Sequence, residues 1–98
     1  MKVGRPLKYL DYLRLLDNET LYCPSSIAAA GLEAGLMSQV AKPDRARLRQ
    51  RIRLTLGRLA RSRDFPEQGD GQVKPSPKQC YYPAWRGSRW KSVLDETQ

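Results

Sequence analysis

Eight arginines lie within 22 residues of this chain, between Lys42 and Arg63. Together with Lys42 they face a single acid, Asp44, so this segment carries a net charge of +8, equal to that of all 98 residues. A guanidinium group donates hydrogen bonds in a planar fork that fits a phosphate or the O6 and N7 atoms of guanine. Because like charges four residues apart repel one another on a helix, this clustering indicates a polyanionic partner.

Three kinds of partner match this charge: nucleic acid, an anionic membrane surface and an acidic protein. The plain alternative is a solvated charged surface that only aids solubility. The rest of the chain does not extend the cluster, because residues 64–98 hold five bases and five acids.

The basic segment also has the pattern of one long helix. Pro43 followed by Asp44 is a start signal, and Pro66 is a stop signal. Apolar residues recur at i, i+4, i+8 and i+11 and form one stripe, namely Leu48, Ile52, Leu56 and Leu59. The sequence therefore predicts a helix over 43–63 whose arginines lie beside and opposite its buried face.

The other segments predict short elements around this helix. A first helix is expected over 6–16, a β-prone run over 20–23, and a second helix from Pro24 to about Gly35 with a serine as its N-cap. Two short strands, 73–78 and 79–82, are expected to meet at a tip that contains proline and serine. Ser88 is expected to cap a last short helix through Leu94. One domain over 6–94 then lies between a flexible basic arm, 1–5, and a flexible tail, 95–98.

This order of elements resembles the winged helix-turn-helix family over residues 6–94. Ile27-Ala28-Ala29-Ala30-Gly31-Leu32 is similar to the Ala and Gly pattern of a helix-turn-helix, although it is one residue short. The resemblance implies an α+β fold of three helices plus a short two- or three-stranded antiparallel β-hairpin.

The resemblance also implies that helix 43–63 enters the major groove of double-stranded DNA, as in a small sequence-selective transcriptional regulator. Base edges are then expected to be read by the outward residues Arg47, Gln50 and Arg53. Phosphates are expected to be held by the residues that flank the apolar stripe, Arg45, Arg49 and Arg51, with Arg58 toward the exit of the groove.

Two further segments are expected to contact DNA. The hairpin 72–82 resembles the wing, and Lys74 and Lys78 near its tip would touch the backbone or the minor groove. Gly4-Arg5-Pro6 resembles the core of minor-groove AT-hooks, so Arg5 is a candidate contact, with a basic tail of no specific role as the alternative. A homodimer that forms on DNA is expected, because one such domain buries only about 600–1,000 Å² there.

Two other functions fit the same sequence. The chain would serve as a protein-interaction adaptor within a nucleoprotein complex if the basic helix contacted another polypeptide. It would bind RNA or single strands if Tyr81, Tyr82, Trp85 and Trp90 formed a stacking platform, although core packing is the simpler role for these rings.

The sequence favours a binding protein over an enzyme. It has no histidine, no phosphate-binding glycine loop and no paired cysteines, so no cofactor, metal or small-molecule ligand is expected. Cys23 and Cys80 are expected to be free thiols. No apolar stretch approaches the ~20 residues that span a bilayer, so we expect a cytoplasmic protein without a membrane partner, associated with the nucleoid in a prokaryote.

Overall fold

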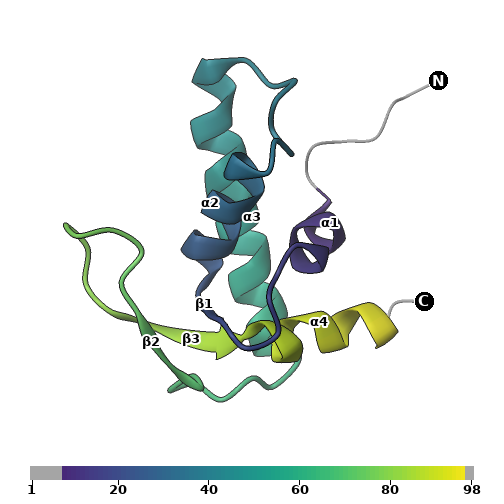
Figure 1. The fold of residues 1–98 in the computed structure, drawn as a ribbon, viewed down its shortest axis with the longest axis vertical. Helices are drawn as coiled ribbons and strands as arrows, with labels where there is room; N and C mark the ends of the chain where they lie inside the picture. The colour runs from purple at the N-terminus through teal and green to yellow at the C-terminus, as the bar shows by residue number, and fades with distance from the viewer. Residues whose placement is uncertain (1–7, 97–98) are drawn as a thin grey trace.

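Four helices and one three-stranded antiparallel sheet make up the part of the chain that this computed structural model describes, residues 8–96. The elements follow one another as α1 (Tyr9–Arg14), β1 (Leu21–Tyr22), α2 (Pro24–Glu33), α3 (Lys42–Ser62), β2 (Gly71–Val73), β3 (Tyr82–Arg86) and α4 (Gly87–Glu96). Figure 1 shows α2 packed along α3, and α4 continuing from β3 below them. The expected α+β class is therefore confirmed, with four helices where the resemblance implies three.

The sheet joins the two halves of the chain. Its strand order is β1-β3-β2, with Leu21 opposite Arg86 and Val73 opposite Tyr82. The two strands of the hairpin overlap the segments predicted for them only at Val73 and Tyr82, because β2 ends at Val73 and β3 begins only at Tyr82. Residues 74–81 form the β2–β3 loop between them. The loop projects on the side of the fold opposite α1 and α4 (Figure 1).

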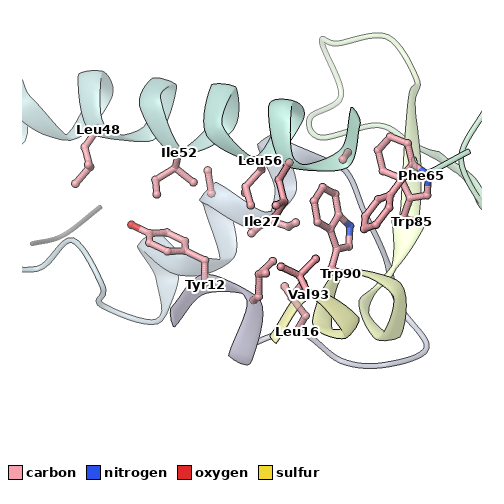
Figure 2. Packing of buried hydrophobic residues seen from close by; sticks show 14 of the residues in the cluster. Tyr12, Leu16, Ile27, Leu48, Ile52, Leu56, Phe65, Trp85, Trp90 and Val93 are labelled. Atoms are coloured by element: carbon pink, nitrogen blue, oxygen red, sulfur yellow. The ribbon is translucent and has the colours of Figure 1, made fainter. Parts of the chain in front are cut away.

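The core lies between the apolar stripe of α3 and the other three helices. Leu48, Ile52, Leu56 and Leu59 are all buried, as predicted. Figure 2 shows three of them directed toward Tyr12, Ile27 and Trp90. Full burial of a side chain of this size stabilises the fold by about 1.5–3 kcal/mol, so this stripe is a principal source of stability.

Three aromatic rings close the core at the C-terminal end of α3. Phe65, Trp85 and Trp90 pack against one another in tilted or edge-on contacts, with centroid separations of 5.1–5.7 Å. The Nε1 atom of Trp85 donates to the carbonyl of Pro66 at 2.8 Å, and that of Trp90 donates to the carbonyl of Tyr22 at 3.0 Å. Because both indole N–H groups have partners, burial of these rings carries no unpaired donor.

The ends of α2 differ from the sequence prediction at one point. Cys23, not a serine, occupies the N-cap position, because Pro24 is already the first helical residue. The Ser26 hydroxyl accepts from the Cys23 N–H at 2.9 Å and donates to the Cys23 carbonyl at 3.0 Å. At the other end Gly35 has a φ of 86°, and Leu36 donates to the Gly31 carbonyl at 3.0 Å. This is the Schellman arrangement, in which a left-handed residue ends the helix.

The same Schellman arrangement ends α3, with Asp64 in the left-handed position that Gly35 occupies after α2. Asp64 has a φ of 56°. Its backbone N–H donates to the carbonyl of Arg61 at 3.2 Å, and the backbone N–H of Phe65 donates to the carbonyl of Ala60 at 3.0 Å. The reversal turns Phe65 back into the core. The helix therefore ends before Pro66.

Candidate nucleic-acid interface

The arginines of α3 surround its buried stripe. Arg47, Arg49, Arg51 and Arg58 are exposed, whereas Arg45 and Arg53 are half-buried. At about 100° per residue, Gln50 and Leu54 lie opposite the buried Ile52. Arg49 and Arg53 then lie on one flank of this outward ridge, and Arg51 and Arg58 lie on the other. The helix therefore presents an outward ridge, formed by the polar Gln50 and the apolar Leu54, between two basic flanks.

No acid neutralises these flanks within residues 8–96. The arginines from Arg45 to Arg61 form no ion pair in this part of the chain, whereas Arg14 pairs with Asp11 and Arg89 pairs with Asp70. Like charges at spacings of four residues destabilise an isolated helix by about 0.2–0.5 kcal/mol per pair. The buried stripe offsets this cost, and the flanks keep their positive charge available to an anion.

Three residues assigned to DNA contact already form hydrogen bonds inside the protein. The Nε atom of Arg45 donates to the carbonyl of Val40 at 2.8 Å, which fixes the loop that precedes α3. The Nη2 atom of Arg53 donates to Oε1 of Gln50, one turn earlier on the same helix. Arg45 therefore has a structural task, and Gln50 and Arg53 form one coupled polar group.

A groove of about 530 Å³ lies between α2, α3 and the β2–β3 loop. Its walls come from Ser25, Ala28 and Ala29 of α2, from Ala46, Arg49, Gln50 and Arg53 of α3, and from Pro75, Ser76 and Gln79 of the loop. The structure thus brings the loop to the basic flank that carries Arg49 and Arg53. Arg47, Arg51 and Arg58 are not among the residues that line the groove.

The lysines of the loop differ in their contacts. The Nζ atom of Lys74 lies 5.6 Å from the ring centroid of Tyr81, which is close enough for a cation–π interaction. Lys78 is exposed. Arg5 lies outside the described residues.

The structure separates the four aromatic residues that suggested a stacking platform. Trp85 and Trp90 are buried, whereas Tyr81 and Tyr82 are exposed to 64% and 43%. Sequence reasoning assigned no DNA contact to Leu54, which is 49% exposed on the outward ridge of α3. The only indication of this exposure in the sequence was the position of Leu54 off the apolar stripe.

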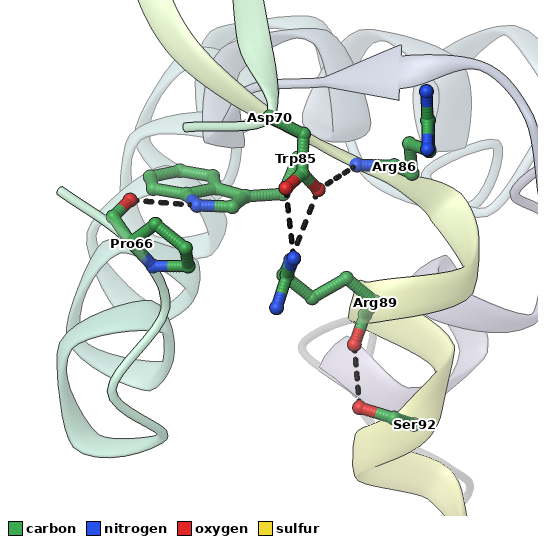
Figure 3. Close-up of polar contacts among 6 residues, drawn as sticks. All are labelled: Pro66, Asp70, Trp85, Arg86, Arg89 and Ser92. Carbon is green, nitrogen blue, oxygen red and sulfur yellow. Dashed lines mark hydrogen bonds and ion pairs between the residues drawn. The ribbon is translucent and has the colours of Figure 1, made fainter. Parts of the chain in front are cut away.

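Asp70, which directly precedes β2, has a structural role. Asp70 accepts from Nε and Nη2 of Arg89 at 2.9 and 2.8 Å and from the backbone N–H of Arg86 at 3.1 Å (Figure 3). The hydrogen bonds from the Arg89 side chain are the main reason that the pKa of Asp70 lies below its ordinary value.

Among the described residues no three Asp, Glu, Cys or His side chains gather as metal ligands would. No described helix is both long enough and apolar enough to cross a bilayer.

Comparison with known proteins places the chain in no family, because no family model, curated protein or solved structure matches it.

Proposed function

We propose that this chain is a winged helix-turn-helix protein that binds double-stranded DNA sequence-selectively, with α3 in the major groove, as a small transcriptional regulator. The observation that carries the proposal is the pair of unneutralised basic flanks on α3, one of which adjoins the β2–β3 loop. The element order supports it as well, since a short strand, two helices and a hairpin follow α1.

The dimensions of α3 suit a groove. The major groove of B-DNA is about 12 Å wide and admits one α-helix with its side chains. With the outward ridge toward the bases, the two flanks of α3 face the two phosphate walls. Arg49 then reaches one wall, and Arg51 and Arg58 reach the other. Phosphate contacts of this kind set the position of the protein and provide most of its salt-dependent affinity.

Sequence discrimination then falls to the ridge. The Gln50 amide is suited to the N6 and N7 atoms of adenine once its hydrogen bond with Arg53 opens, and Arg47 is suited to guanine. We add Leu54 to this set, because an exposed apolar side chain between arginines can pack on the C5 methyl group of thymine. We do not retain a DNA contact for Arg45, whose side chain bonds to Val40.

The β2–β3 loop would act as the wing beside this helix. It projects away from α1 and α4, and its residues Pro75 and Ser76 line the groove next to Arg49 (Figure 1). Lys78 is free to reach a neighbouring phosphate, whereas Lys74 must first leave the ring of Tyr81. We expect Lys78 to contribute more to binding than Lys74.

A titration with matched polyanions tests this proposal against its two competitors. The titrants are a random-sequence duplex of about 20 base pairs, one of its single strands, and polyglutamate of equal charge. DNA binding predicts that the duplex binds most tightly and that its affinity falls steeply with salt. Preference for the single strand would support the stacking alternative instead, and equal binding of the duplex and polyglutamate would support the adaptor.

A further inference from the structure

A second cavity, of about 400 Å³, lies between the C-terminal half of α3, the start of α2 and β3. Ala60, Phe65, Pro83 and Trp85 give it apolar walls. Its volume falls within the range of about 300–1,000 Å³ that small-molecule sites occupy. Because its lining comes from four separate segments of the chain, no local motif in the sequence indicates it.

The charged residues of this cavity favour an anion. Arg53 and Arg61 line it, against the single acid Glu67. Within the described residues Arg61 forms no ion pair, and Arg53 bonds only to the neutral amide of Gln50. Two guanidinium groups therefore border an apolar hollow without a carboxylate bound to either.

Gly57 leaves the backbone of α3 open toward the cavity. It lies inside α3, where glycine is less favourable than alanine, and it belongs to the cavity lining. A Cβ atom at this position would have Nη1 of Arg61 as its nearest neighbour, at 3.9 Å, so the fold itself has room for alanine. At Gly31, by contrast, a Cβ would lie 2.1 Å from the ring of Tyr12. Packing therefore requires glycine at position 31, whereas at Gly57 the space beside the helix backbone stays open to the cavity.

We propose that this cavity is a binding site for a small aromatic carboxylate. The carboxylate lies between Arg53 and Arg61, and the aromatic body packs against Trp85 and Phe65. The ligand passes close to the backbone at Gly57, where a methyl group would occupy its space. A DNA phosphate is a poorer occupant, because it would leave the apolar walls unused. The proposal does not depend on whether α3 binds DNA.

The test uses 2-naphthoate as the probe and the uncharged 2-naphthamide as its isostere. Isothermal titration with the whole chain is expected to show one saturable site for naphthoate and at least tenfold weaker binding of the amide. The R61Q variant is expected to lose most of this preference for the charged probe. R58Q removes an equal charge from the opposite flank of α3, outside the cavity, and is expected to leave the naphthoate affinity and the preference over the amide unchanged.

The G57A variant separates ligand binding from folding. Its Tm is expected to rise by about 4 °C, because alanine is the better helix former. Its affinity for naphthoate is expected to fall at least tenfold. The proposal is overturned if the folded protein shows no saturable naphthoate binding, if G57A binds naphthoate as tightly as the unmodified chain, or if R61Q keeps the full preference over the amide.

Discussion

Arg89 holds Asp70 through two parallel hydrogen bonds, from Nε to Oδ2 at 2.9 Å and from Nη2 to Oδ1 at 2.8 Å. The backbone N–H of Asp70 in turn donates to the carbonyl of Ala84 at 2.8 Å. The bonds with Arg89, drawn in Figure 3, join the base of the β2–β3 hairpin to the start of α4. Asp70 therefore links the start of the hairpin both to β3 and to α4.

Substitution of Asp70 is expected to weaken the fold in a pH-dependent way. The pKa of Asp70 is lowered in the folded protein, mainly by the hydrogen bonds from Arg89. Its contribution is therefore complete above the unfolded pKa of about 3.9 and is lost as pH falls through the lower folded value. Asp70→Asn should cost about 1 kcal/mol at pH 7 and flatten the acid side of the stability curve.

Urea unfolding of Asp70→Asn from pH 2 to pH 7 measures both effects. Asp11→Asn is the matched control, because it removes an ion pair between exposed side chains on α1. A smaller acid dependence remains in Asp70→Asn, since hydrogen bonds from Thr20 and Glu19 also lower the pKa of Asp17. An unchanged acid limb in Asp70→Asn would mean that the pair does not stabilise the hairpin.

Gly31 is expected to be intolerant of any side chain. A Cβ there would lie 2.1 Å from the ring of Tyr12, which is fully enclosed in the core. Because a packed core relaxes only partly, Gly31→Ala should lower the free energy of unfolding by about 1–3 kcal/mol. Thermal unfolding of this variant beside Gly57→Ala gives opposite shifts in Tm if the packing is as described. A rise in Tm for both would mean that α1 does not press on α2 at this point.

The two cysteines are expected to react at different rates. Neither forms a disulfide, and Cys23 is buried whereas Cys80 is exposed in the β2–β3 loop. An aromatic disulfide reagent should modify one thiol per chain rapidly and the second only on unfolding. Cys80→Ser removes the fast phase and leaves stability unchanged. Fast modification of two thiols in the native protein would place Cys23 in contact with solvent.

The sequence predicts the long helix well because its evidence is local. The apolar period of α3 is repeated over twelve residues, from Leu48 to Leu59, and all four members are buried. The start of α2 was less predictable, because proline and two serines compete for the cap and the first turn. Pro24 occupies the first helical position, so the cap falls on Cys23.

The hairpin was misplaced because its strands are defined by distant partners. Tyr22 and Leu21 pair with Trp85 and Arg86, more than sixty residues later, so β3 lies further along the chain than the strand predicted over 79–82. The candidate site likewise combines features that local sequence predicts with features that it does not. Helical spacing placed the arginines around α3. The bond from Arg45 to Val40 depends on the shape of the loop before α3, and the cavity beside Gly57 arises only from tertiary packing.

The central claim is that α3 reads duplex DNA, and the most direct test is affinity for two duplexes across ionic strengths. One duplex is selected from a random library by the protein, and the other is a scrambled version of it. Arg49→Ala is expected to weaken both duplexes alike and to reduce the salt slope by about one. Gln50→Ala is expected to lower the ratio of the two affinities roughly tenfold and to leave the slope unchanged. Arg14→Ala serves as the control, because it removes one positive charge from α1 and none from α3. If Arg47, Gln50 and Arg53 can all become alanine without changing that ratio, α3 does not read DNA, and the adaptor function takes its place.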